Sequence, residues 1–390
     1  MDLKFSKEDL AFREEVRTWI SENRPREQRP MDRPSMREYD LAWQKTQANA
    51  GWAGISWPKE YGGRGASLIQ ALIWFEEYGG AGLPGIDACF VGLNHAGPTL
   101  MTRSSEEQKS YHLPKILGGD VVWCQGFSEP EAGSDLASLK ARAVVDGDEL
   151  VVTGQKIWTS FADVADWQEL LVRTDPDVPK HKGITWVICD MKLPGIEIRP
   201  IETMDEEHEF CEVFYNEVRI PLKNVVGDIN DGWSVAMSTL AFERGTAFTV
   251  NQVRLAKTVE EIIEMAKHRV GPDGRRPAIQ DDEIARRLAR ARADVAAMRA
   301  MTYRTISRSL RDGTPGPEGS IIKLFYSDLM QSVYRLAFEI IGADGLEFLN
   351  RWMPGGWSGS YLYSPAGSLG GGTSEIQRNI IGERVLGLPR

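Results

Sequence analysis

Residues 141–153 read ARAVVDGDELVVT, in which two valine-containing runs flank a turn that contains Gly147. β-Branched residues favour strands, and glycine supplies the backbone freedom that a tight turn needs. The stretch therefore predicts a β-hairpin. Strand-like runs also lie at 170–172, 184–188 and 211–215, and no helical periodicity interrupts them. Residues from about 121 to 226 are thus predicted to form a compact β-domain.

Helical patterns lie on both sides of this β-domain. Near the N-terminus, Phe12, Val16 and Ile20 are spaced to share one helix face. Further on, Ser105 and Gln108, within the polar run 104–108, predict a capping box that opens a helix. Segments rich in Ala, Leu, Arg and Glu then predict long helices at about 232–268, 281–311 and 317–341, with a short last helix from about residue 374. The predicted order is helical, β, helical.

Composition limits the possible functions. The 390 residues are 42% hydrophobic and 26% charged, with a formal net charge of −10. A globular, acidic balance excludes a disordered or collagen-like chain and argues against nucleic-acid binding. The N-terminus lacks the apolar core of a signal peptide, and no apolar run approaches the ~20 residues of a membrane span. We expect a cytoplasmic protein with no membrane insertion.

Metal and nucleotide motifs are missing from the sequence. Cys89, Cys124, Cys189 and Cys211 are widely separated, so we expect buried, reduced thiols and no metal site. The five histidines are scattered and form neither a metal cluster nor an evident catalytic triad. Rossmann and P-loop fingerprints are also absent. Any chemistry must therefore depend on loops and acids.

Three stretches could hold a ligand. The loop 124–135 concentrates small residues and hydroxyl groups, so its backbone N–H groups could approach an anion, although a capped turn is the simpler interpretation. Within 154–160, Trp158 could stack on a planar cofactor or could be a buried core residue. The run 370–378 places three glycines before a helix, which is typical of a phosphate cradle and equally of a flexible linker.

Glu243 is the candidate acid. On a helix, Leu240, Ala247 and Val250 would share its face. Desolvation on such an apolar stripe favours proton uptake, as a general base requires. An internal ion pair with an arginine of another helix is the alternative.

Together these segments resemble the acyl-CoA dehydrogenase family of flavoproteins over essentially the whole chain. The matching motifs are WPKEYGG at 57–63, SEPEAGSD at 128–135, GQKIW at 154–158, VRIP and NVVG within 218–227, and GTSEIQRNII at 372–381. The resemblance implies an α+β multidomain fold. It consists of an N-terminal α-helical domain at 1–120, a central β-barrel-like domain at 121–228 and a C-terminal four-helix bundle at 229–390.

The same resemblance implies FAD as the cofactor and an acyl-CoA as the substrate. The positions that match the family's flavin contacts are Gln125, Phe127, Ser128, Gly133, Ser134, Trp158, Ser160, Thr373 and Glu375, of which the last two serve the nucleotide end. The positions that match substrate contacts are Ser134, Arg244 and Gly371. Because the family normally forms tetramers, a homotetramer or a heterotetramer is expected.

Departures from the family pattern narrow the resemblance. Gly371 stands where many members carry the catalytic glutamate, whereas Glu243-Arg244 matches members whose base lies on the first long helix of the bundle. The resemblance thus implies that Glu243 is the base. The glycine run is similar to that of bacterial members acting on bulky acyl-CoAs such as steroid side-chain thioesters, some of them two-subunit heteromers. Residues 270–277 replace the family's usual arginine segment that reaches a partner's FAD.

The implied reaction is α,β-dehydrogenation to a trans-2-enoyl-CoA, with electrons passed to an electron-transferring flavoprotein. Two alternatives stay open. One is an oxidase or monooxygenase of the same fold that uses O₂. The other is a subunit of a heteromeric dehydrogenase, whose silent form would lack a base at both glutamate positions.

Overall fold

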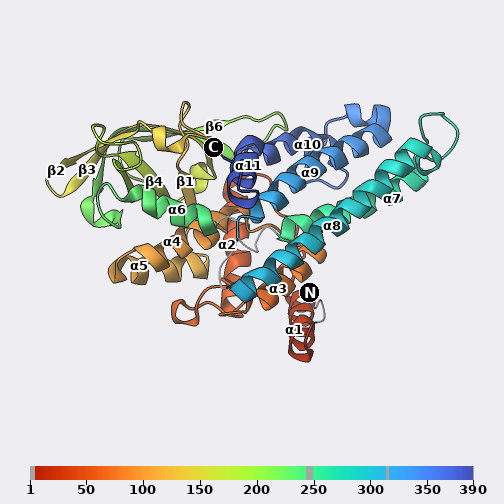
Figure 1. Ribbon diagram of the computed structural model, residues 1–390, viewed down its shortest axis with the longest axis horizontal. Coiled ribbons are helices and arrows are strands. Elements are labelled where there is room, and N and C mark those ends of the chain that lie inside the picture. The colour runs from red at the N-terminus through yellow and green to blue at the C-terminus, as the bar shows by residue number, and fades with distance from the viewer. Residues whose placement is uncertain (1–4, 243–248, 313–315, 390) are drawn as a thin grey trace.

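The computed structural model describes residues 5–242, 249–312 and 316–389 (Figure 1). Its first helices are α1 (Lys7–Asn23), α2 (Arg33–Asn49), α3 (Leu68–Gly80), α4 (Gly97–Arg103) and α5 (Glu106–Gly118). The strands are β1 (Trp123–Gly126), β2 (Arg142–Asp146), β3 (Glu149–Ser160), β4 (Trp167–Arg173), β5 (Ile184–Asp190), β6 (Ile196–Ile201), β7 (Phe210–Pro221) and β8 (Val225–Val226). The last helices are α6 (Gly232–Phe242), α7 (Thr249–His268), α8 (Asp282–Asp312), α9 (Gly319–Ile341), α10 (Trp357–Tyr363) and α11 (Ser374–Ile380). The predicted order of helices, sheet and helices is confirmed.

Local sequence fixes where several of these helices begin. At α5, the Ser105 hydroxyl accepts from the Gln108 N–H and the Gln108 side chain accepts from the Ser105 N–H. This is the predicted capping box, which satisfies two N–H groups that the helix itself leaves unpaired. Left-handed Gly119 then ends the helix, as glycine does readily. Equivalent boxes open α1 and α3.

The strands form one open sheet. Its main path runs in the order β6-β7-β3-β2-β4-β5-β8, and β1 adds to it in parallel beside β4. The predicted hairpin is β2 and β3, whose turn at Gly147 has a positive φ. Because the path ends at β6 and β8 without a pairing between them among the described residues, the sheet is not a closed barrel. One of its faces packs a core that includes three of the four cysteines, and all four are free and buried, as predicted.

The long C-terminal helices build a separate core. Leu255, Val259 and Ile262 on α7 follow helical spacing and pack against apolar positions of α8 and α9. The shorter helices α10 and α11 pack on α9, and α7 also packs against α3 of the first part (Figure 1). No described helix combines the length and the apolar character that crossing a membrane requires.

Arg351 ties these helices to the sheet. It lies between α9 and α10, and its guanidinium contacts Glu209 Oε2 at 2.7 Å and Asp205 Oδ2 at 3.0 Å, both just before β7. The guanidinium also stacks 3.6 Å above the ring of Tyr363 on α10. A buried charge held by two carboxylates and an aromatic face fixes the two parts against each other.

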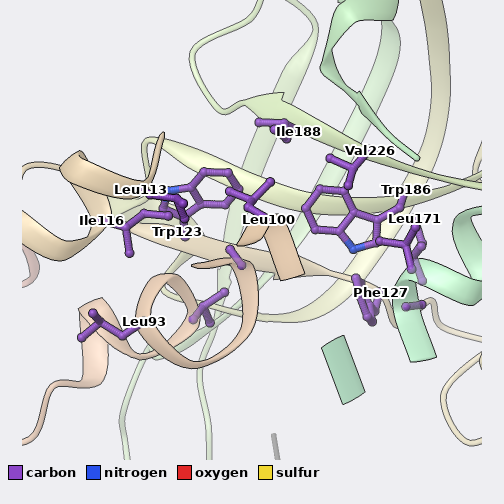
Figure 2. Close-up of a cluster of buried hydrophobic side chains, with 14 of the residues drawn as sticks. Leu93, Leu100, Leu113, Ile116, Trp123, Phe127, Leu171, Trp186, Ile188 and Val226 are labelled. Atoms are coloured by element: carbon purple, nitrogen blue, oxygen red, sulfur yellow. The ribbon is translucent and has the colours of Figure 1, made fainter. Parts of the chain in front are cut away.

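The opposite face of the sheet packs on the first helices. Figure 2 shows Trp123, Leu171 and Trp186 of the sheet facing Leu100 and Leu113 of α4 and α5. All of these side chains are at most 2% exposed, and burying a large apolar side chain contributes about 1.5–3 kcal/mol. Phe127, the first residue after β1, belongs to the same cluster, so the loop that follows β1 is anchored at its start.

Candidate active site

The loop after β1 is held against β3 by a buried ion pair. Lys156 Nζ on β3 lies 2.7 Å from Glu129 Oε1 and also donates to the Phe127 carbonyl at 3.1 Å. Glu129 accepts two further bonds from the main-chain N–H groups of Lys140 and Ala141. Burial lowers the pKa of Lys156 to about 8, although the neighbouring Glu129 carboxylate opposes the shift. The loop is therefore a fixed feature of the site.

Trp158 projects from this fixed frame. It lies within an irregular stretch of β3, between Lys156 and Thr159, where the pairing with β7 shifts register. Its φ is +59°, a left-handed value that a bulky residue adopts at a cost of about 1–3 kcal/mol. The side chain is 55% exposed and touches Phe210 edge-on at 5.9 Å. The interpretation of Trp158 as a core residue is wrong, and the exposed ring is available to a ligand.

The other predicted flavin contacts near this ring fall on two adjoining segments. Ser128 accepts a main-chain bond from Ile157 at 3.0 Å, which joins the loop to β3 just before Trp158. Gly133 and Ser134 are exposed at the tip of the loop, and Ser160 ends β3 opposite Phe210. Thr159, between Trp158 and Ser160 in the sequence, is buried, and its hydroxyl has no hydrogen-bond partner among the described residues. Residues far apart in the sequence thus meet at one end of the sheet.

Three polar side chains lie beneath this end of the sheet, of which His95 and Glu169 are buried and Gln125 is half-buried. The Gln125 amide on β1 donates to Glu169 Oε1 on β4 at 2.7 Å, and its nitrogen lies 3.2 Å from His95 Nδ1. His95 comes from the π-helix Gly92–Ala96, a rare form that is frequent at functional sites. His95 and Glu169 carry no signal in the sequence, because the parallel pairing of β1 with β4 brings Glu169 to Gln125 and the packing of the π-helix on β1 brings His95 there.

The glycine run before α11 is anchored as well. Gly371 and Gly372 have φ values of +63° and +84°, which favour glycine. The Gly371 carbonyl accepts from the Gln377 side chain at 2.9 Å, and the Gly372 carbonyl accepts from Lys323 of α9 at 2.7 Å. These bonds argue against a flexible linker.

The residues predicted to contact the nucleotide end of FAD come directly after the glycine run in the sequence. The Thr373 hydroxyl caps α11 by accepting from the Ile376 N–H at 3.3 Å, and Glu375 is exposed. The buried hydroxyl of Ser374 has no hydrogen-bond partner in the described part of the chain. Glu243 and Arg244, the predicted base and its neighbour, lie outside the described residues, between α6 and α7.

A cavity of about 370 Å³ opens beside the loop that carries Ser134. Its lining includes the cationic side chains of Lys140, Arg142, Arg173 and Lys180 together with Leu139 and Val178. Arg173 is 9% exposed and donates to three main-chain carbonyls, those of Ala137, Leu139 and Lys180. The cavity therefore combines positive charge with apolar walls.

The anchored loop, the exposed tryptophan and the flanking helical parts together form a candidate ligand site. Signatures of the N-terminal, middle and C-terminal domains of acyl-CoA dehydrogenases match residues 6–120, 124–218 and 230–386. The chain belongs to the acyl-CoA dehydrogenase family.

Relatives with names and structures agree with this assignment. The chain is 38% identical to the acyl-CoA dehydrogenase IpdE1 of Mycobacterium tuberculosis, over 97% of each chain. A solved structure of the Tcur3481-Tcur3483 steroid ACAD matches with 33% identity and a TM-score of 0.85, covering all of both chains. The ChsE4-ChsE5 complex from Mycobacterium tuberculosis matches with 32% identity and a TM-score of 0.84, again over both whole chains.

Proposed function

We propose that this chain is an FAD-dependent acyl-CoA dehydrogenase that converts an acyl-CoA thioester to the trans-2-enoyl-CoA. The observation that carries the proposal is Trp158, an exposed indole held at a strained backbone angle beside the anchored loop 127–134. Strain and apolar exposure both cost stability, and such costs are concentrated at ligand sites. Within this family, the planar flavin ring is the ligand that such an indole fits.

Several groups of the chain support FAD binding. Ser160, which is half-buried at the end of β3 two residues after Trp158, carries a hydroxyl that can bond a polar ring edge. The Ser374 hydroxyl, for which the described residues provide no hydrogen-bond partner, lies beside Thr373 and Glu375, the proposed contacts of the nucleotide end. FAD, when bound, would supply the acceptor for the hydride that leaves the Cβ–H bond of the substrate, while the electrons of the Cα–H bond form the new Cα–Cβ π bond.

The proton chemistry is assigned to the chain's own residues. We assign to Glu243 the removal of the substrate's α-proton, because Gly371 leaves no carboxylate at the other family position. The main-chain N–H of Gly371 is proposed to bond the thioester oxygen, where it stabilises the negative charge that develops as the α-proton leaves. Arg244 and Ser134 are proposed to contact the CoA thioester.

The basic cavity supports a phosphorylated substrate. Two of its four cationic side chains, Lys140 and Lys180, contact Glu131 and Asp135 of the exposed loop at 2.7 Å, and the other two are Arg142 and Arg173. Positive charges of this kind attract phosphate groups. Because Gly370 and Gly371 replace two large side chains of many family members, we infer that the acyl group is branched or ring-bearing. The names of the steroid ACAD relatives agree with this inference.

The partners follow the same reasoning. We propose an electron-transferring flavoprotein as the electron acceptor and a homotetramer or heterotetramer as the assembly. The solved ChsE4-ChsE5 complex supports the heteromeric form. Domain boundaries at 120/121 and 228/229 complete the proposal.

The purified chain tests the central proposal. It is expected to take up FAD and turn yellow, alone or only with a sister subunit, and anaerobic mixing with a branched or cyclic acyl-CoA should bleach the flavin. A matched Glu243→Gln variant should keep FAD yet bleach at least ~10²-fold more slowly, because an amide cannot accept the proton. A colourless protein under both expression conditions would overturn the proposal, and peroxide production in air would select the oxidase alternative.

A further inference from the structure

We infer that Glu169 and His95 fix the side-chain amide of Gln125 so that its carbonyl oxygen is presented to an N–H group at the edge of the flavin ring. This inference rests on the proposed binding of FAD and adds two positioning residues to it. The three side chains come from three elements: the π-helix Gly92–Ala96, β1 and β4.

The strand register places the pair on one face. Gln125 and Glu169 are opposite each other in the parallel pairing of β1 and β4, two positions after Trp123 and Trp167. Side chains alternate along strands, so Gln125 and Glu169 share the face of these tryptophans, which packs on the first helices. Glu169 is fully buried and His95 is 4% exposed, whereas Gln125 is half-buried. Gln125 is thus the member of the cluster that extends to the surface.

Hydrogen-bond chemistry then sets the direction of the amide. A carboxylate only accepts, so the amide nitrogen of Gln125 must face Glu169 Oε1, at 2.7 Å. The second N–H of the same nitrogen is directed to His95 Nδ1, at 3.2 Å. With both N–H groups used, the amide cannot rotate without losing two bonds, and the Gln125 oxygen is left as an acceptor.

The position of Gln125 identifies the ligand group. Gly126 follows it, and the anchored loop with Phe127 and Ser128 begins at the next residue. The isoalloxazine ring has an imide N–H on its pyrimidine edge, and that N–H is a donor that an amide oxygen can bond. A free glutamine would offer its N–H₂ equally well, so the role of Glu169 and His95 is to select the oxygen.

The test measures FAD binding and flavin spectra rather than turnover alone. Glu169→Gln replaces a carboxylate, which can only accept, by an amide that can also donate, so the Gln125 amide becomes free to rotate. Gln125→Met removes the side-chain oxygen that is proposed to accept from the flavin. Each is expected to weaken FAD binding by about tenfold, as judged by titration of the apoprotein, and to shift the visible flavin bands. Tyr215→Phe is the matched control: it removes the hydroxyl that donates to buried Gln168, the neighbour of Glu169 on the other face of β4, and should leave both readouts unchanged.

FAD methylated at the imide nitrogen isolates the proposed bond. Wild-type protein should bind it more weakly than FAD, and the difference should shrink severalfold in Gln125→Met. An equal loss in wild type and Gln125→Met would overturn the inference, even if Glu169→Gln failed to fold. Wild-type protein that takes up no FAD at all would instead contradict the proposed function, so the two failures are distinguishable.

Discussion

Lys156→Met is expected to loosen the loop that carries the flavin contacts. The change removes the bonds from Lys156 to Glu129 and to the Phe127 carbonyl, and it leaves a buried carboxylate with only the N–H groups of Lys140 and Ala141. Breaking a buried ion pair on one side costs about 3–5 kcal/mol. The carboxylate can escape by binding a proton, which at pH 7 costs a glutamate about 3.7 kcal/mol from its ordinary value. Protonation therefore limits the electrostatic part of the loss to about 4 kcal/mol.

Hydrogen exchange reports this loss locally. The Ile157 amide bonds the Ser128 carbonyl and the Ala141 amide bonds Glu129, so their protection should fall more than about 100-fold at pH 7. Because protonation becomes cheaper in acid, the difference from wild type should shrink between pH 7 and pH 5. Lys156→Met with Glu129→Gln removes both charges and should recover part of the Ile157 protection, although the one amide oxygen of glutamine can accept from only one of the Lys140 and Ala141 N–H groups. Lys140→Met breaks the exposed pair with Glu131 and should leave the protection of the Ile157 and Ala141 amides unchanged. Unaltered protection in Lys156→Met would refute the reasoning.

Three further outcomes are expected. His112 is buried, which lowers its pKa to about 4, so the unfolded chain binds more protons than the folded chain between about pH 6.5 and 4. The free energy of unfolding should therefore be unaffected by His112 above this window and should fall within it by at most about 3 kcal/mol. His112→Gln should remove this pH dependence from an unfolding titration. Trp158→Gly relieves the strained φ, so the melting temperature should not drop, while FAD affinity measured by titration should fall; a lower melting temperature with intact affinity would make Trp158 structural. Arg351→Met leaves the buried Asp205 carboxylate without its ion-pair partner, at a cost of about 3–5 kcal/mol, and also removes the partner of half-buried Glu209. Exchange should therefore increase at the segment before β7, and an unchanged exchange pattern would contradict the linking role of Arg351.

Short-range patterns predicted much of the fold. The capping box at Ser105 and the hairpin at Gly147 were readable because each depends on residues within a few positions of one another. Trp158 could not be placed in the same way. Its exposure follows from the irregular stretch between Lys156 and Thr159, which depends on pairing with β7 more than fifty residues away. Aromatic residues in strands are usually packed, so propensity pointed to the core.

The cluster around Gln125 combines one residue of a family motif with two residues that lie outside every matching motif. The motif residues of the loop after β1 were identified because family members share them, whereas Glu169 and His95 belong to none of the matching motifs. Each is ordinary in its own sequence context. The parallel pairing of β1 with β4 brings Glu169 to Gln125, and the packing of the π-helix Gly92–Ala96 on β1 brings His95 there. A buried carboxylate in this position costs stability unless it is bonded. Its hydrogen bond to Gln125 offsets that cost and also fixes the orientation of the Gln125 amide. One contact therefore stabilises the buried carboxylate between the sheet and the helices and determines that an oxygen, rather than an N–H group, faces the surface beside the loop.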